Sequence, residues 1–130
     1  MKKKFSKFWK SSKKPRKQRK YIINAPLHIK RKMMSSNLSK ELRKRFGIRS
    51  FPLRKGDTVR VFRTKFKGKE GKVLKVNYKK NGVEISGIQI KKQDGSRVNV
   101  LIHPSNLQII ELNLEDKKRA EALKRKETKT

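Results

Sequence analysis

The chain of 130 residues contains no cysteine, few acidic residues and few aromatic residues. Without cysteine it can form no disulfide, no thiolate metal site and no thiol nucleophile. Its purely apolar runs stop short of five residues, whereas a transmembrane helix needs ~20. The basic start, Met1-Lys2-Lys3-Lys4, is not followed by the apolar stretch of a secretory signal. We therefore expect an intracellular protein without a membrane partner.

Positive charge is what the chain has in excess. Forty Lys and Arg residues stand against ten Asp and Glu residues, which gives a net charge of +30. A surface that repels itself this strongly favours a polyanionic partner and disfavours a small-molecule substrate or a homo-oligomer. Because 32% of the residues are hydrophobic and the mean hydropathy is -0.97, we expect part of the chain to be an extension that folds on its partner.

The charge divides the chain into three predicted parts. The counts of basic and acidic residues are 19 and one in residues 1–50, 14 and five in residues 51–112, and seven and four in residues 113–130. These parts are predicted to be a basic extension, a folded body and a helical tail. Residues 1–20 hold eleven cations and no acid, so they are expected to be disordered in isolation. Trp9 among these cations favours stacking on bases over a solvated tail or a nuclear-import signal.

A short helix is predicted near residues 38–46 of the extension. Leu38, Leu42 and Phe46 fall on one face of such a helix, and Gly47 is placed to end it. Its N-cap is expected from one of three residues, Ser36, Asn37 and Ser39.

A second helix is predicted within residues 113–130. Asn113 is placed to cap it, and Glu115 and Asp116 are expected in its first turn. The basic residues near its end agree with the helix dipole.

The body is predicted to consist of short strands separated by turns. Alternating and β-branched runs indicate five strands: 58–63, 72–78, 83–90, 97–102 and 108–112. Asn81-Gly82 is typical of a two-residue hairpin turn, and Asp94-Gly95 is a second signal of this kind. Gly87 is interpreted as a bulge that bends its strand. Short strands with close turns, and no crossover helix, favour a small closed barrel over a parallel sheet.

The expected core of this barrel is aliphatic. Its predicted members are Leu53, Val59, Val61, Val73, Leu74, Val76, Ile85, Ile88, Val98, Val100 and Ile109. Gly68 and Gly71 are expected to adopt positive φ where the chain reverses between the first two strands.

Groups that could support catalysis are scarce. His28 and His103 are the only imidazoles, and no triad or zinc-binding pattern is present, so we expect no enzyme, no metal and no cofactor. The segment Gly68-Lys69-Glu70-Gly71-Lys72 has two residues between its glycines, whereas a P-loop has four and is followed by Lys and Ser or Thr. A nucleotide-binding loop is therefore disfavoured.

Two stretches of the body resemble a KOW motif, in which a glycine lies between two strands. They are Arg54-Lys55-Gly56-Asp57-Thr58-Val59-Arg60-Val61 and Lys67-Gly68-Lys69-Glu70-Gly71-Lys72-Val73-Leu74-Lys75-Val76. The segment His103-Pro104-Ser105-Asn106 and residues 24–32 and 35–43 of the extension are similar to one family in particular. This is the uL24 family of large-subunit ribosomal proteins, called L26 in eukaryotes, in its archaeal and eukaryotic branch.

The resemblance implies a Src-homology-3-like barrel with a basic N-terminal extension and no enzymatic activity. It implies a structural constituent of the large ribosomal subunit that binds large-subunit rRNA near the nascent-peptide tunnel exit and supports subunit assembly and translation. The implied partners are this rRNA and neighbouring large-subunit proteins. The implied location is the cytosolic ribosome, with a nucleolar stage of assembly in a eukaryote.

The candidate RNA-binding residues are mainly cations. Arginines are expected to hold phosphates in a bidentate manner and lysines to act as point charges. The candidates for stacking on bases are Trp9, Phe8, Tyr21 and His28. For Tyr21 and His28 the alternative is packing on the chain itself. For the segment 103–106 it is a local turn formed by the side chain of Ser105 or Asn106. The predicted contacts are Trp9, Lys13, Lys14, Arg16, Lys17, Arg19, Lys20, His28, Lys30, Arg31, Lys32, Lys40, Arg43, Arg45, Arg49, Arg54, Lys55, Lys65, Lys67, Lys69, His103 and Ser105, with Gly56, Gly68 and Gly71 forming the KOW turn.

Two other functions are open at this point. A KOW-bearing transcription elongation factor would be a protein-binding module, and it would normally carry a further αβ domain. A nonspecific nucleic-acid binder would have the charge without the barrel.

Overall fold

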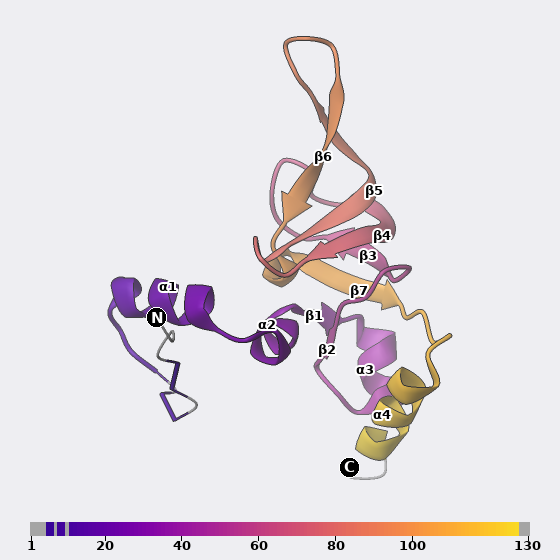
Figure 1. Ribbon diagram of the computed structural model, residues 1–130. Coiled ribbons are helices and arrows are strands. Elements are labelled where there is room, and N and C mark those ends of the chain that lie inside the picture. Colours follow the sequence, from indigo (N-terminus) through magenta and orange to yellow (C-terminus); the bar gives the residue numbers. More distant parts are fainter. Residues whose placement is uncertain (1–4, 7, 10, 128–130) are drawn as a thin grey trace.

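The computed structural model describes residues 5, 6, 8, 9 and 11–127, and the rest of the predicted extension and tail lies outside the described residues. Within this part, seven strands form a curved sheet, which four α-helices and one 3-10 helix flank (Figure 1). The predicted mainly β, barrel-like architecture is confirmed. In chain order the elements are α1 (Pro15–Asn24), α2 (Leu27–Met33), β1 (Ser35–Leu38), α3 (Lys40–Phe46), β2 (Ser50–Pro52), β3 (Thr58–Val61), β4 (Glu70–Asn77), β5 (Gly82–Lys91), β6 (Arg97–Ile102), η1 (Pro104–Asn106), β7 (Leu107–Glu111) and α4 (Lys117–Glu127).

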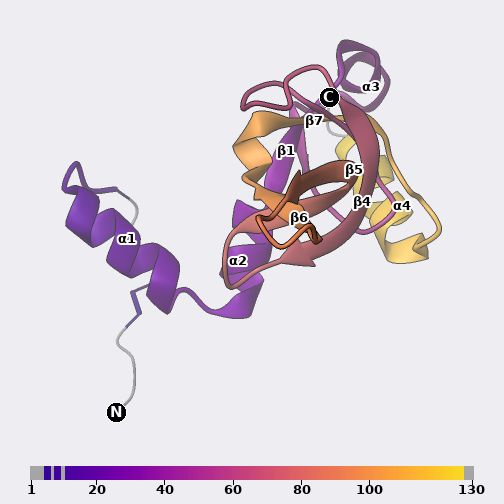
Figure 2. The same ribbon diagram turned by 90° about the horizontal axis from the view of Figure 1, so that it is seen from above.

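The strands follow one another across the sheet in the order β2-β1-β7-β3-β4-β5-β6. Neighbouring strands are antiparallel, except that β1 and β7 are parallel. The sheet wraps around its core, and the β5–β6 hairpin extends beyond it (Figures 1 and 2). Strands β3 to β7 are the five predicted strands, with ends shifted by at most one or two residues.

Strands β1 and β2 do not follow from the sequence, because serine, asparagine and proline are poor strand formers. Tertiary pairing holds them instead. Ser36 lies opposite Phe51 of β2, and Leu38 lies beside Ile109 of β7. The buried Ser36 hydroxyl donates a hydrogen bond to the Pro104 carbonyl at 2.6 Å. Residues 35–38 are therefore part of the sheet, although the charge pattern groups them with the extension.

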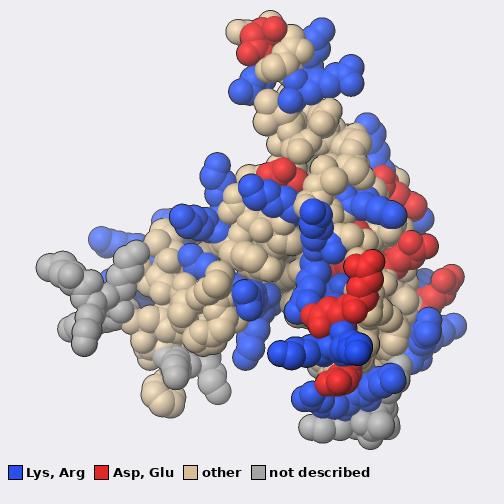
Figure 3. All heavy atoms as spheres, turned by 45° about the vertical axis from the view of Figure 1, so that its right-hand side comes forward, with Lys and Arg blue, Asp and Glu red and all other residues tan. Residues whose placement is uncertain are grey.

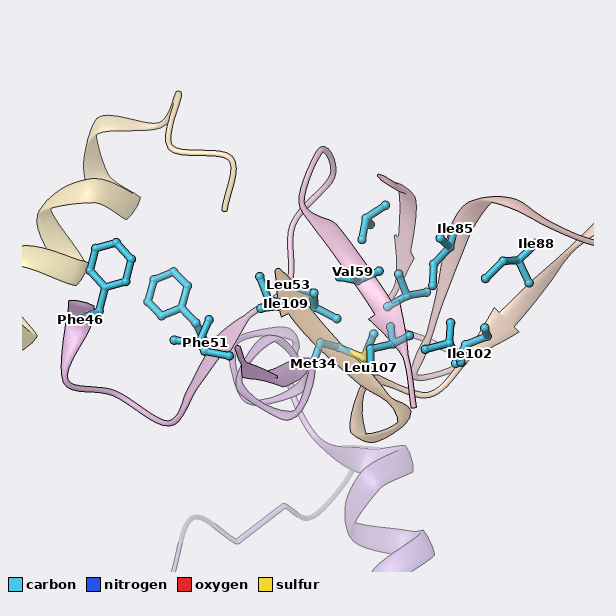
Figure 4. Close-up of a cluster of buried hydrophobic side chains, with 14 of the residues drawn as sticks. Met34, Phe46, Phe51, Leu53, Val59, Ile85, Ile88, Ile102, Leu107 and Ile109 are labelled. Carbon is cyan, nitrogen blue, oxygen red and sulfur yellow. The ribbon is translucent and has the colours of Figure 1, made fainter. Parts of the chain in front are cut away.

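A single cluster of buried side chains fills the inside of the sheet and continues under α3 and α4 (Figure 4). Seven of the predicted core residues are buried, and Val76 and Val100 are partly buried against them. The extension and the tail also contribute to the cluster. Its members are Met34, Leu38, Phe46, Phe51, Leu53, Val59, Val61, Val73, Val83, Ile85, Ile88, Ile102, Leu107, Ile109 and Leu123.

Two predicted core residues, Leu74 and Val98, are exposed to 41% and 42%, so their assignment to the core is wrong. In β4 the pairing with β5 slips between Val73 and Lys75, and this bulge turns Leu74 away from the core. Val98 lies opposite Ile90 in the outer part of the β5–β6 hairpin. This part of the hairpin extends beyond the barrel, so Val98 does not contact the core (Figure 1).

The predicted bulge and hairpin turns are confirmed only in part. Gly87 has a φ of +77° where the β5–β6 register shifts, which confirms the predicted bulge. Gly95 has a φ of +87° in the turn that closes the same hairpin, but Asp94 does not have a positive φ. Lys92 N donates to the Ser96 carbonyl oxygen at 2.8 Å, which leaves three residues between them, so the two-residue turn predicted at Asp94-Gly95 is wrong. The two-residue turn at Asn81-Gly82 is wrong: Asn77 pairs with Gly82, so the loop has four residues, and only Asn81 of that dipeptide has positive φ, at 48°.

The glycines of the predicted KOW turn serve different purposes. Gly68 has a φ of +86° in the β3–β4 loop, as predicted, and Gly56 has a φ of +92° before β3. Gly71 lies within β4 without positive φ, so that part of the prediction is wrong. A Cβ atom there would lie 2.5 Å from the Ser86 carbonyl oxygen, so Gly71 is required by the close approach of β5.

Helices α3 and α4 lie side by side below the sheet (Figure 1). Helix α3 begins at Lys40, two residues later than predicted, because Leu38 is in β1 and the Ser39 hydroxyl caps the helix by accepting from Leu42 N at 3.3 Å. Gly47 ends it with a φ of 63°, as predicted.

Helix α4 also begins later than predicted, at Lys117. Asn113 does not cap it, because Asn113 lies in the preceding loop and its side chain bonds to Glu115. Asp116 is the cap instead of a first-turn residue: its Oδ1 accepts from Lys118 N at 3.0 Å.

A buried ion pair fixes α4 to the barrel. The Arg119 guanidinium binds both carboxylate oxygens of Asp57, at 2.6 and 2.7 Å, and the exposed fractions of the two side chains are 3% and 0%. The same guanidinium donates to the carbonyl oxygens of Asn113 and Pro52. Because the charges satisfy each other, the pair is tolerated in the interior.

Candidate nucleic-acid interface

The N-terminal arm, which we define as residues 1–33, carries no acidic residue. Figure 3 shows Lys and Arg spread over the visible face of the molecule, while Asp and Glu lie on the hairpin and on the side away from the arm, among Lys and Arg. Helix α1 lies apart from the barrel, and none of its residues is buried (Figures 1 and 2). The described part of the arm therefore presents a surface of uniform charge that the barrel leaves uncovered.

Helix α1 was not predicted from the sequence, which indicated for residues 1–20 only a block that is disordered in isolation. Pro15 fixes the backbone at the first helical position, and the Lys14 carbonyl accepts from Lys17 N and Gln18 N at 3.1 and 3.3 Å. Six predicted contact residues lie on α1 or just before it. They are Lys13, Lys14, Arg16, Lys17, Arg19 and Lys20.

An aromatic cluster packs on one face of α1. The Tyr21 ring centre lies 5.0 Å from that of Phe5 and 4.8 Å from that of Trp9. Together with Lys17 and Lys20 these rings line a shallow pocket of about 280 Å³. The structure thus brings Trp9 to cations of α1, and it confirms for Tyr21 the alternative of packing on the chain itself.

Cations of α2 and α3 form the next part of the predicted surface. Lys30, Arg31 and Lys32 lie in the last turn of α2, where they complement the helix dipole, and His28 is exposed on the same helix. Lys40, Arg43 and Arg45 lie on α3, and Arg49 follows it. Arg43 is partly buried, and its Nε donates to the Leu38 carbonyl oxygen at 2.9 Å.

Two further predicted groups lie on loops. Lys65, Lys67 and Lys69 are exposed on the β3–β4 loop, with the Lys69 Nζ 5.5 Å from the Phe66 ring centre. His103 caps η1, because its Nδ1 accepts from Ser105 N at 3.2 Å and bonds to the Ser105 hydroxyl at 2.8 Å. The local turn expected as an alternative for the segment 103–106 is thus present, and it involves the Ser105 side chain together with that of His103.

One groove collects predicted residues from distant segments. It lies between α2 and β4, has a volume of about 810 Å³, and is lined by Arg31 and Lys32 of α2 and by Arg54 and Lys55 of the turn before β3. Lys75 of β4 joins them, although the sequence did not mark it as a contact. The remaining lining is apolar or aromatic: Pro52, Leu53, Leu74, Val76 and Tyr78.

Tyr78, Leu74 and Lys75 are the groove residues that sequence reasoning missed. The sequence analysis placed Leu74 in the core together with Val73 and Val76. The bulge, which has no clear sequence signal, lets Val73 and Val76 both face the core while Leu74 is exposed. The sequence shows that residues 72–80 are basic. Only the fold shows that residues of this segment lie beside α2.

Several acidic side chains of the barrel and of the loop before α4 are held by basic ones. Asp57 binds Arg119, Glu70 binds Arg60 at 2.7 Å, and Asp116 binds Arg54. The Arg54 hydrogen bond holds the pKa of the Asp116 carboxyl below its ordinary value, and the Ser96 hydroxyl and amide lower the pKa of Asp94 at the hairpin tip. The carboxylates of Asp116 and Asp94 are therefore ionised at neutral pH.

Within the described residues, no group of three or more His, Asp or Glu side chains is arranged to hold a metal ion. No described helix is long and apolar enough to cross a membrane.

Comparison with known proteins supports the resemblance seen in the sequence. A family model described as ribosomal proteins L26 eukaryotic, L24p archaeal matches residues 12–126. The large ribosomal subunit protein uL24 of Nanoarchaeum equitans is 55% identical over 116 residues, which cover 89% of this chain and 78% of the relative. The protein of the same name from Korarchaeum cryptofilum is 48% identical over 118 residues, covering 91% of this chain and 90% of the relative. The chain therefore belongs to the ribosomal protein family of eukaryotic L26 and archaeal L24p, a family of structural components rather than enzymes.

Proposed function

We propose that this chain is a structural constituent of the large ribosomal subunit that binds large-subunit rRNA through its arm and the cationic rim of its barrel. Membership in the ribosomal protein family supports this function. The observation that carries it is helix α1: four of its ten residues are cations, none is acidic, and none is buried against the barrel. Such a helix has little intrinsic stability in water, so an anionic partner accounts for it best.

The contacts are divided between phosphates and bases. Arginines of α1, α2 and α3 bind phosphates, and the lysines of the β3–β4 loop add point charges. Double-stranded RNA has a major groove too narrow for side chains, so specificity comes from the shape of a folded junction, from 2′-hydroxyls and from unpaired bases. In this proposal residues 1–50 are the main rRNA-binding extension, residues 51–112 are the KOW barrel, and residues 113–130 form the tail.

The proposed position is near the nascent-peptide tunnel exit, beside other large-subunit proteins, where the chain supports subunit assembly and translation. The working location is the cytosolic ribosome, and assembly in a eukaryote would include a nucleolar stage. The family resemblance is the support for this part. A ribosome stalled on a nascent chain that carries a photoreactive residue tests it, since a cross-link to this protein is expected when that residue reaches the exit.

Sedimentation of a cell lysate tests the ribosomal function directly. The protein is followed by immunoblot through sucrose gradients in moderate and in high salt. We expect it to move with large subunits in both, because an interface that fits by shape and includes an ordered arm resists screening. Migration at the top of the gradient, or with bulk DNA or polymerase, would contradict the proposal and favour a nonspecific binder or an elongation factor.

A further inference from the structure

We propose that the groove between α2 and β4 binds one unpaired nucleotide, with its base stacked on Tyr78 and its phosphates held by the surrounding cations. This inference rests on the proposed RNA-binding function and adds to it a defined site and ligand.

The groove has an exposed apolar and aromatic floor. The β4 bulge turns Leu74 outward, and Val76 and Tyr78 extend the same surface. Tyr78 is half-buried: it packs against the barrel core and also lines the groove. In a chain with a charge of +30, apolar surface gathered inside a cationic rim is best explained by a ligand with a flat apolar face and negative charge.

Five cations from three segments surround this floor. Arg31 and Lys32 come from α2, Arg54 and Lys55 from the turn before β3, and Lys75 from β4. None of the lining residues is acidic. Asp116 binds one arm of Arg54 and so fixes the direction of its guanidinium at the edge of the groove. Cations on more than one side suit a nucleotide, whose base is flanked by a phosphate on each side.

Arg31 and Tyr78 form the stacking position. The Arg31 Cζ lies 6.0 Å from the centre of the Tyr78 ring, at the outer limit of a cation–π contact. Both groups are planar, and bases stack on aromatic rings and on guanidinium planes alike. A small movement of the exposed Arg31 side chain lets a base lie against the tyrosine while the guanidinium stays beside it.

An acidic peptide fits the groove less well than a nucleotide. Its carboxylates would meet the cations, but they would leave the floor of Leu74, Val76 and Tyr78 without a partner. The wall formed by the end of β2 offers no main-chain donor for strand addition, because Pro52 has no N–H and Leu53 N already donates to the Met34 carbonyl at 2.9 Å. The groove volume lies within the roughly 300–1,000 Å³ of small-ligand sites.

Zero-length ultraviolet cross-linking of the full chain bound to large-subunit rRNA tests the site. After digestion with ribonuclease and trypsin, which cuts after Lys75 and Lys79, we expect a nucleotide adduct on the peptide 76–79 that contains Tyr78. Salt-dependent rRNA binding with adducts elsewhere but none on this peptide would overturn the site and leave the proposed function standing. Failure of the chain to bind the rRNA would overturn the proposed function itself.

Two tyrosine variants separate stacking from charge. Tyr78→Leu keeps an apolar side chain against the core but removes the ring, and we expect rRNA affinity to fall about 5- to 100-fold with an unchanged log–log salt slope. Tyr78→Phe is the matched control and binds like the wild type. If Tyr78→Leu binds normally while Lys75→Ala lowers both affinity and slope, the groove holds phosphates only and base stacking is wrong.

A second pair of variants leaves the core untouched. Leu74→Glu places a carboxylate in the groove, whereas Leu114→Glu makes the same change at a residue of similar exposure, 39% against 41%, outside it. We expect at least about a tenfold loss of affinity for Leu74→Glu and a much smaller loss for Leu114→Glu. Equal losses, or a protein cross-link at residues 76–79 in place of the nucleotide adduct, would overturn the proposal.

Discussion

The barrel and the arm of this chain are stabilised in opposite ways. The barrel has side chains that are fully buried, such as Leu38, Val59 and Ile109, and an internal ion pair. The first helix of the arm has no buried residue and is held by two ring contacts on Tyr21. The two regions differ correspondingly in charge, since the acid-free residues 1–33 are followed by a body in which several acids are paired.

This difference indicates a division of labour within one chain. Burial supplies the barrel with its own stability, because apolar area removed from water outweighs the ordering of the chain. The arm lacks that source, so under the proposed function its order is expected to depend on neutralising its charge against a partner. Changes in the barrel are therefore expected to alter unfolding, and changes in the arm to alter RNA binding.

The largest effect on stability is expected from the buried ion pair. Arg119→Met removes the partner of the buried Asp57 and should lower the free energy of unfolding by about 3–5 kcal/mol, because an unpaired carboxylate stays in the interior. Urea denaturation measures this loss. The double variant Asp57→Asn with Arg119→Met should recover part of it, and a double variant as unstable as the single one would contradict the explanation.

A matched pair of isoleucines compares the two regions directly. Ile109→Ala in β7 removes a side chain with 0% exposure and should cost about 2–5 kcal/mol. Ile23→Ala in α1 removes one that is 65% exposed and should change stability by less than about 0.5 kcal/mol. Thermal unfolding monitored at several wavelengths is the measurement. Similar losses in both variants would mean that the arm belongs to the same cooperative unit as the barrel.

Substitutions of glycines in the KOW turn are expected to lower stability by a smaller amount, and by more at Gly71 than at Gly68. Gly71→Ala places a Cβ atom 2.5 Å from a carbonyl oxygen of β5 and should cost about 1–3 kcal/mol. Gly68→Ala meets nothing within 4 Å and carries only the strain of positive φ, about 1 kcal/mol. Equilibrium unfolding of both variants checks the order, and a larger loss for Gly68→Ala would contradict the assignment of Gly71 to a close strand approach.

The smallest effect concerns the exposed pair of Asp116 and Arg54. Because Arg54 lowers the pKa of the Asp116 carboxyl below its ordinary 3.8, the pair stabilises the fold above that value and is lost as the pH falls through the lowered pKa. A carboxyl titration followed by NMR should give a midpoint below 3.8 that rises in Arg54→Ala. An unchanged midpoint would mean that the contact does not persist in solution.

Much of the barrel was predictable because its signals are local. The five predicted strands are present, Gly87 and Gly95 adopt positive φ, and Gly47 ends α3. Alternation of β-branched residues and the backbone freedom of glycine each act within a few residues, so one sequence reveals them.

The features that the sequence did not predict share one cause: they depend on contacts between segments that are far apart in the sequence. Leu74 is exposed because β4 bulges against β5, and β1 forms only because β2 and β7 flank it. Arg119 looks like any other cation of a basic helix, but its carboxylate partner lies 62 residues earlier. The groove around Tyr78 escaped notice for the same reason, since its walls come from α2, the turn before β3 and β4.

The sequence marked the cations as candidate RNA contacts through charge and family resemblance, but it did not reveal which of the candidates contact other residues of the chain. Arg43 and Arg54 have partners within the chain, and His103 and Ser105 bond to each other. Trp9 packs on Tyr21 in the structure. Such local contacts depend on which side chains become neighbours after folding.

The most direct test of this division of labour compares two helices that lose the same charge. Arg16→Ala with Arg19→Ala removes two cations from α1, and Lys117→Ala with Lys118→Ala removes two exposed cations from α4. Binding to large-subunit rRNA is measured over a range of salt concentrations. We predict that the α1 variant lowers the magnitude of the log–log salt slope by about 1.4–1.8, from 0.7–0.9 per lost phosphate contact, while the α4 variant changes it little. Equal changes in the two variants would contradict a specific role for the arm.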